Sequence, residues 1–342
     1  MEISYEPLEL RVRNTLNIAH EGFSDDVFHN VLVRLEHEGV TGLGESAPFF
    51  IYGENQRTVL AALETLAPVV RKAGDPWRAE RLVEELDRAL GRNWSAKAAV
   101  EMALYDLQGK LCEKPLHCML GLRAKDTPLS NFTLYLDGTE ALHDQLRLVA
   151  DWPVLKIKLG GPNDLEVMDL VRSEAPRAVV RVDANAAWEP RQALEMIRIL
   201  VDYEVEFVEQ PLPAGDIDGM KWLHSRSPLP VIADESCLRL EDVPQLCGRF
   251  DGINIKLTKC GGIRHALKMI ACARALGLKV MLGCMVESSI SLSAAGQISP
   301  LADYLDLDGN TLLEQDPFVG MKFDRCRLTL PAEPGLGVRP AG

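Results

Sequence analysis

The chain has 342 residues, which at roughly 150 residues per domain corresponds to about two domains and excludes a single small module. It carries 50 Asp and Glu against 37 Lys and Arg, a formal net charge of −13 at pH 7. This acidity disfavours binding to nucleic acid or to an anionic membrane surface. Hydrophobic residues make up 47% of the chain and charged residues 25%, so the chain can bury a sizeable core and disorder is not expected.

The sequence predicts a cytoplasmic protein. Its first residues do not combine a basic region with an apolar segment, and no stretch reaches the roughly 18 apolar residues of a membrane span. The eight cysteines lie in apolar segments without a Cys-x-x-Cys pair, which favours reduced packing thiols over a disulfide framework or a zinc site. A homo-oligomer is compatible with these features.

The first 120 residues predict a small α+β domain. Three runs have the composition of strands: residues 8–16, 30–36 and 40–45. Three later segments carry apolar residues at three- and four-residue spacing, which is typical of amphipathic helices: residues 56–72, 77–90 and 96–112. Strands followed by helices, rather than alternating with them, indicate an α+β arrangement.

From about residue 130, short apolar runs alternate with segments of helical length. There are eight such runs: residues 132–136, 154–159, 179–183, 205–209, 231–234, 252–257, 279–282 and 304–308. Near-continuous Val, Ile and Leu strands separated by helices are typical of a parallel sheet that is buried on both faces. We therefore predict a (β/α)8 TIM barrel over residues 121–315, with residues 1–120 as a capping domain to which residues 316–342 return. The alternative is an open doubly wound sheet, but no Gly-x-Gly-x-x-Gly opens a helix after any of these runs.

Polar residues end five successive runs, and in a TIM barrel the carboxyl ends of the strands form the catalytic mouth. They are Lys156 and Lys158, Asp183, Glu209, Asp234 and Lys256. Three carboxylates from adjacent strands would repel one another, so Asp183, Glu209 and Asp234 predict a bound divalent cation. Hard oxygen ligands without His or Cys favour Mg²⁺, and Mn²⁺ is the alternative.

The two apolar runs that end with lysines indicate acid/base chemistry. Strands 2 and 6 of an eight-stranded barrel face each other, which places Lys158 and Lys256 on opposite sides of a metal-bound substrate. One lysine can remove a proton from the carbon next to a carboxylate, and the other can return a proton from the opposite face while the metal stabilises the enediolate. Lys156 shares the inward face of its strand with Lys158 and is expected to act electrostatically on that base.

The order of these motifs resembles the muconate-lactonizing-enzyme subgroup of the enolase superfamily. The matching motifs are Lys-x-Lys, Asp-x-Asn, Glu-Gln-Pro, Asp-Glu-Ser, the later Lys256, Glu287 within residues 284–288, and the capping-domain phrase at residues 42–48. The resemblance implies a Mg²⁺-dependent enzyme in which Asp183, Glu209 and Asp234 are the metal ligands. It further implies that Lys158 and Lys256 form the acid/base pair, that Glu287 belongs to the substrate site, and that the N-terminal domain supplies a lid.

The eighth run contains Asp306 and Asp308, two residues apart and therefore on one face of a strand. Strand 8 faces strand 4, so these acids are expected across the barrel from Glu209, where they suit a cation at the far end of the substrate. A carboxylate, an acidic α-carbon and a distal ammonium together have the outline of a dipeptide. The same Asp-x-Asp is similar to that of the dipeptide epimerases of this subgroup, and we expect epimerisation of the C-terminal residue of an L,L-dipeptide.

Two loops of the first domain, residues 18–26 and 49–55, are expected to read the side chain at the reacting carbon. The first contains Glu21 and two aspartates but no Lys or Arg, so an apolar or cationic side chain is favoured over Glu. Three other functions stay open: an N-acylamino-acid racemase or o-succinylbenzoate synthase of the same subgroup, an aldolase with a Schiff base on Lys256, and a non-catalytic binding barrel.

Overall fold

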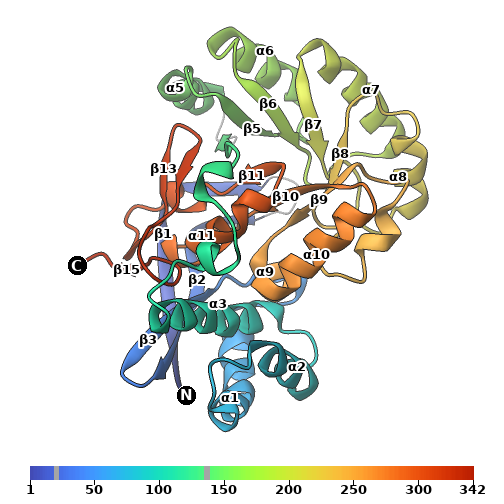
Figure 1. Cartoon of the computed structure of the whole chain (residues 1–342). Helices are drawn as coiled ribbons and strands as arrows, with labels where there is room; N and C mark the ends of the chain where they lie inside the picture. The colour runs from blue at the N-terminus through green and yellow to red at the C-terminus, as the bar shows by residue number, and fades with distance from the viewer. Residues whose placement is uncertain (19–22, 135–138) are drawn as a thin grey trace.

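The computed structural model describes residues 1–18, 23–134 and 139–342. The N-terminal part begins with a three-stranded antiparallel sheet in the order β1-β2-β3, followed by three helices that pack at one end of the molecule (Figure 1). Its elements are β1 (Glu2–Ile18), β2 (Phe23–His37), β3 (Val40–Ser46), η1 (Phe50–Tyr52), α1 (Gln56–Ala73), α2 (Ala79–Ala89) and α3 (Trp94–Leu111). The predicted strands and helices of this part are confirmed.

Local sequence signals account for these elements. The Asn55 side chain accepts hydrogen bonds from the N–H groups of Arg57 and Thr58, which caps the first turn of α1. Gly74 ends the same helix with a φ of 64°, a conformation that costs glycine little. Gly42 and Gly44 of β3 face the backbone of α3 so closely that a Cβ at either position would collide with it. The glycines of the 42–48 phrase therefore allow the sheet to lie directly on α3.

Eight parallel strands form the second part, in the order β4 to β11 along the sheet. They are β4 (Phe132–Leu134), β5 (Val154–Lys158), β6 (Val179–Asp183), β7 (Val205–Glu209), β8 (Val231–Ala233), β9 (Gly252–Ile255), β10 (Lys279–Gly283) and β11 (Tyr304–Asp306). A parallel bridge between Ser130 and Leu305 joins the two edges of this sheet. The predicted barrel is confirmed; the last residues of the first predicted run, 135 and 136, lie outside the described residues.

Helices follow most of the strands and cover the outside of the barrel (Figure 1). The remaining helical elements are α4 (Leu116–Met119), η2 (Ala124–Asp126), α5 (Thr139–Val149), α6 (Asp164–Glu174), α7 (Pro190–Asp202), α8 (Ile217–His224), η3 (Val243–Leu246), α9 (Leu257–Cys260), α10 (Ile263–Ala275), α11 (Ser289–Ile298), η4 (Ser299–Leu301) and η5 (Gly309–Leu312). After β8 the described chain forms the short η3 instead of an α-helix. No helix in the described ranges is long and apolar enough to cross a membrane.

The C-terminal segment runs back along the outside of the barrel in two small antiparallel pairs: β12 (Phe318–Val319) with β15 (Arg339–Pro340), and β13 (Lys322–Asp324) with β14 (Arg327–Thr329). It contacts both parts of the molecule. The Leu336 N–H donates to Asp106 of α3 at 2.8 Å, and Gln297 of α11 donates to the Leu336 carbonyl at 3.3 Å. The domain boundaries at residues 120 and 315 stay a prediction.

A buried carboxylate fixes the N-terminal sheet to the barrel. Glu45 of β3 is fully buried and accepts hydrogen bonds from the Ser288 N–H at 3.0 Å and the Ser288 hydroxyl at 2.6 Å, at the start of α11. Asn30 of β2 donates to the same carboxylate at 2.7 Å. The main apolar cluster also crosses this junction, because Leu32, Leu43 and Met102 pack with the barrel core. The two parts therefore share one interface beside the carboxyl ends of the strands.

Candidate active site

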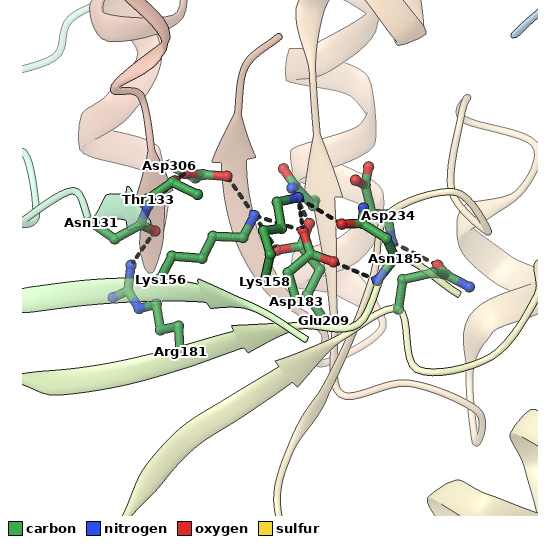
Figure 2. A network of polar contacts seen from close by, with 12 residues as sticks. Asn131, Thr133, Lys156, Lys158, Arg181, Asp183, Asn185, Glu209, Asp234 and Asp306 are labelled. Carbon is green, nitrogen blue, oxygen red and sulfur yellow. Dashed lines mark hydrogen bonds and ion pairs between the residues drawn. The ribbon is translucent and has the colours of Figure 1, made fainter. Parts of the chain in front are cut away.

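Charged side chains from five neighbouring strands meet at the carboxyl end of the barrel (Figure 2). Lys156 and Lys158 lie on β5 at alternate positions and therefore on the same face. Lys158 is paired in register with Asp183 of β6, and Asp183 with Glu209 of β7. Asp234 directly follows β8 and Lys256 directly follows β9. The barrel thus brings together all six strand-end residues that the sequence singled out.

Asp183, Glu209 and Asp234 form a compact group of buried carboxylates. One oxygen of each lies within 4.8 Å of the others, and none of the three residues is more than 1% exposed. Burial alone would raise the pKa of Asp183, but Lys156 and Lys158 outweigh it and lower that pKa to about 2. Burial and the Asp183 charge raise the pKa of Glu209 to about 7. Three negative charges in one dry site therefore need a nearby cation to stay ionised together.

Three lysines supply positive charge to this group. Lys158 Nζ lies 2.7 Å from Asp183 Oδ2, and Lys256 Nζ lies 2.9 Å from Asp234 Oδ2. Lys156 Nζ contacts Asp183 at 3.0 Å and Glu209 Oε2 at 2.7 Å. Lys158 and Lys256 thus approach the group from its two opposite ends. The three carboxylates offer only hard oxygen donors at a spacing that one ion can bridge, so these residues fit a cation such as Mg²⁺.

Lys259 and Asn254 hold this carboxylate group, and sequence reasoning gave neither of them a role. Lys259 of α9 is 4% exposed and forms an ion pair with Asp234 Oδ1, while its ammonium also donates to the carbonyl oxygens of Asp234 and Asn254. Asn254 Nδ2 donates to Glu209 Oε1 at 2.7 Å. The sequence did contain a signal for Asn254: side chains alternate along β9, so Asn254 lies on the same inward face as Lys256.

Asn185 and Gln210 shape the turns that follow β6 and β7, with φ values of 43° and 35°. The Asn185 side-chain oxygen accepts from Lys158 Nζ at 2.9 Å, and its N–H donates to Asp183 at 3.0 Å. The Gln210 side-chain oxygen accepts from the N–H of Asp234 at 2.9 Å. Non-glycine residues at positive φ are uncommon and cluster at functional sites. These two side chains therefore position the lysine and the carboxylate beside them.

Asp306 and Asp308 lie on the same side of the site but have different partners. Asp306 Oδ2 contacts Lys156 Nζ at 2.6 Å, and its other oxygen accepts from Asn131 at 2.6 Å and from the Thr133 hydroxyl at 3.2 Å. Asp308 Oδ2 accepts from the Thr133 N–H at 2.6 Å. Burial and the neighbouring Asp306 raise the pKa of Asp308 to about 7. Asp306 is thus engaged through both oxygens and pairs with a lysine, whereas Asp308 is held by the N–H and the side chain of Thr133.

One cavity contains most of these groups. It is lined by Phe28, Asn30, Ala47, Pro48, Phe49, Ile51, Tyr52, Thr133, Lys156, Lys158, Asn185, Asp234, Glu235, Lys256, Cys284, Met285, Val286, Asp306, Asp308 and Gly309. The N-terminal part contributes its aromatic and apolar wall, and the barrel contributes its charged floor. Of the first specificity loop predicted from the sequence, residues 19–22 lie outside the described residues.

Glu287 occupies a different position from the other predicted site residues. It is 3% exposed and is not among the described residues that line the cavity. Burial and the charge of Glu45 raise its pKa to about 8. Glu287 therefore lies behind the cavity wall, near the carboxylate that connects the two parts of the molecule.

Comparison with known proteins places this geometry in context. Over 340 residues the chain is 40% identical to an L-Ala-D/L-Glu epimerase of Bacteroides thetaiotaomicron, covering 99% of this chain and 88% of that protein. It is 36% identical to a hydrophobic dipeptide epimerase of Roseobacter litoralis, covering 98% of both chains. The structure resembles a dipeptide epimerase from Enterococcus faecalis solved with Mg and the dipeptide L-Leu-L-Tyr, with a TM-score of 0.91, 31% identity and 98% coverage of both chains.

Two family models match the chain. Residues 11–121 match the N-terminal domain of mandelate racemase and muconate lactonizing enzyme, and residues 141–341 match the enolase C-terminal domain-like model. The chain therefore belongs to the mandelate racemase and muconate lactonizing enzyme family of the enolase superfamily.

Proposed function

We propose that this protein is a Mg²⁺-dependent dipeptide epimerase that inverts the α-carbon of the C-terminal residue by moving a proton between its two faces. The observation that carries the proposal is the placement of Lys158 and Lys256 at opposite ends of one carboxylate group, within a cavity that also contains Asp308. The three relatives described above, each named as an epimerase of dipeptides, support the same activity.

The carboxylates of Asp183, Glu209 and Asp234 are the proposed metal ligands. A bound Mg²⁺ supplies Lewis-acid stabilisation of negative charge on the substrate carboxylate, which makes the adjacent α-proton more acidic. In the proposed reaction one of Lys158 and Lys256 accepts this proton at Nζ, and the other donates a proton from its own Nζ to the opposite face. Lys156 stays a cation that neutralises the site, because three carboxylates surround its ammonium.

Asp308 is the proposed partner of the N-terminal ammonium of the dipeptide. It lines the cavity and is held by the neutral N–H and side chain of Thr133, and within the described residues it forms no ion pair with a lysine or arginine. Asp306 lines the same cavity, but its oxygens are engaged by Lys156, Asn131 and Thr133. We therefore assign direct contact with the ammonium to Asp308 and positioning of Lys156 to Asp306. The role predicted for Glu287 becomes support of the cavity wall.

We further propose that the side chain at the reacting carbon is apolar or cationic rather than acidic. Among the described residues that line the cavity, the cations are Lys156, Lys158 and Lys256, and each already faces a carboxylate. The wall opposite them contains Phe28, Phe49, Ile51 and Tyr52. A glutamate side chain would be desolvated there without a positive partner, which is costly. The Bacteroides relative is named as an L-Ala-D/L-Glu epimerase, so Ala-Glu is the substrate against which this preference has to be tested.

The rival functions meet specific obstacles in the same residues. An N-acylamino acid or a succinylbenzoate precursor lacks an ammonium group, and it would place apolar or anionic atoms against the buried acids Asp306 and Asp308. An aldolase with a Schiff base on Lys256 would leave Lys158 on the opposite side, and the two acids Asp306 and Asp308, without a use in the reaction. The epimerase proposal uses every one of these charges.

Incubation of the protein with Mg²⁺ and a pooled L,L-dipeptide library in D2O tests the proposal. Each dipeptide that turns over gains one dalton at its second α-carbon, which mass spectrometry detects. We expect exchange with apolar and basic C-terminal residues and little with Ala-Glu. Incorporation only into N-acyl amino acids, with none into any dipeptide, would refute the proposed function. Strong exchange with Ala-Glu would refute the side-chain preference alone.

A further inference from the structure

A second cavity lies behind the wall of the active site. Its volume is about 390 Å³, and it opens between the turn that contains η1, the start of α3, and the chain that follows β8 and β9. Phe49 and Tyr52 line this cavity as well as the active-site cavity. An occupant would therefore contact the reverse side of the proposed substrate wall. The volume falls in the range that holds small organic ligands.

Two arginines line this cavity and have no anionic partner in the described part of the chain. Arg239 stacks on the ring of Trp94, with its guanidinium carbon 5.1 Å from the ring centroid, and its Nε is buried without a hydrogen-bond acceptor. Arg92 lies at the exposed rim, in the loop that precedes α3. Within the described residues, no carboxylate oxygen lies within 4.0 Å of either guanidinium group. A buried guanidinium N–H that lacks an acceptor is costly unless a ligand or solvent supplies one.

The other charged groups in the cavity wall are already engaged. Glu54 accepts hydrogen bonds from the N–H groups of Trp94 at 2.7 Å and Ser95 at 3.2 Å, which satisfies the start of α3 from inside the protein. Lys259 is paired with Asp234 and with backbone carbonyl oxygens. The charge that stays available to a ligand is therefore that of Arg92 and Arg239.

We propose that this cavity is a binding site for a small organic anion, whose carboxylate or phosphate group is held by Arg92 and Arg239. Guanidinium groups match both kinds of oxyanion through paired N–H donors, and the indole of Trp94 keeps the Arg239 fork in a fixed plane. The site is separate from the metal-binding carboxylates, and it does not depend on the proposed epimerase activity. Carboxylate and phosphate anions share the chemistry that this wall recognises, so two probes distinguish them.

Isothermal titration calorimetry of the full chain with inorganic phosphate and, separately, with succinate tests the site. The titrations are made without Mg²⁺ or dipeptide and at constant ionic strength, with chloride as the ionic control. We expect saturable binding of at least one probe, and the stronger probe identifies the preferred oxyanion. Arg239→Gln and Arg92→Gln should each weaken that binding by about tenfold or more, because each removes a charge-assisted hydrogen-bond donor.

Arg226→Gln is the matched control. Arg226 also stacks on a tryptophan, with its guanidinium carbon 4.8 Å from the ring of Trp222, but it lies outside the cavity lining. The Arg226→Gln variant should leave the affinity for the probe unchanged. Because Arg92 is exposed, its variant is expected to fold even if Arg239→Gln is unstable, and thermal unfolding checks both. Absence of saturable binding with both probes, or binding that survives in Arg92→Gln and in a folded Arg239→Gln, would overturn the proposal.

Discussion

Lys156 links Asp306 of β11 to the carboxylate group of the neighbouring strands: its Nζ lies 2.6 Å from Asp306 Oδ2 and 2.7 Å from Glu209 Oε2. The proposed ammonium end and the proposed metal end of the site are therefore joined by one buried cation. In the proposed mechanism the two acids of the Asp-x-Asp pair therefore have separate duties, although they are two residues apart.

The first prediction separates those duties. Asp308→Asn should raise KM for dipeptides with a free N-terminus by about tenfold or more, with a smaller effect on kcat, because it removes a charge that binds the ammonium. Asp306→Asn should mainly lower kcat, because it removes a partner of Lys156 within the reacting site. Steady-state polarimetry with one active dipeptide measures both constants. Asp303→Asn is the control, since Asp303 pairs with Arg274 outside the cavity. Identical kinetic defects in the two variants would contradict the division.

Metal binding provides the second prediction. Wild-type protein should bind Mg²⁺ in calorimetry, and Asp183→Asn should weaken that binding by about tenfold or more, because one hard anionic ligand is lost. Glu206→Gln serves as the control: Glu206 lies on β7, the strand that carries Glu209, but it pairs with Arg181 away from the site. Equal Mg²⁺ affinity in wild type and Asp183→Asn would show that the three carboxylates are not the ligands.

Lys259 gives a prediction for stability. Its ammonium is buried and bonded to Asp234 and to backbone carbonyl oxygens, so Lys259→Met should lower the free energy of unfolding by about 3 kcal/mol. Lys268→Met removes a pair with Glu80 in which both side chains are 44% exposed, and it should cost below about 1 kcal/mol. Urea unfolding compares the two variants. A loss no larger for Lys259 than for Lys268 would mean that the buried amine does not stabilise the fold.

The buried Glu101 of α3 predicts a pH effect on stability. Burial raises its pKa from 4.5 to about 8, against the opposing effect of N–H donors at the start of α10. Between pH 4.5 and about 8, Glu101 holds a proton in the folded state that it releases in the unfolded state. The stability that this bound proton contributes is therefore complete below pH 4.5 and is lost as the pH rises through about 8. Wild type should therefore lose stability relative to Glu101→Gln between these pH values. Urea titrations at several pH values measure the free energy of unfolding of both proteins. An increase in wild-type stability relative to Glu101→Gln as the pH rises would refute the prediction.

The repeat of apolar runs made the barrel predictable. Polar residues at the ends of five successive runs made the site predictable, because the alternation of a strand directs their side chains inward. Asp183, Glu209 and Lys158 are neighbours in register, so strand order alone brings them together. The separate partners of Asp306 and Asp308 were not predictable, since they depend on Asn131 and Thr133 at the opposite edge of the sheet.

Other features escaped prediction because they depend on turns. Lys259 reaches Asp234 only because α9 begins immediately after β9 and turns the lysine back toward the barrel. The positive φ of Gln210 likewise arises from the turn after β7, which no periodicity reveals. The second cavity is lined by both Arg92 and Arg239, which are far apart in sequence and come from the two different parts of the molecule.

The two-base mechanism is tested most directly by deuterium exchange with single dipeptide epimers. Lys158→Ala and Lys256→Ala are each incubated in D2O with Mg²⁺ and with the L,L or the L,D form of an active dipeptide. Both variants should lose epimerisation by a factor of about 100 or more, while each still exchanges the α-proton of one epimer, a different one for each variant. Epimerisation at the wild-type rate in either variant, or loss of exchange from the same epimer in both, would contradict the assignment of Lys158 and Lys256 to opposite faces.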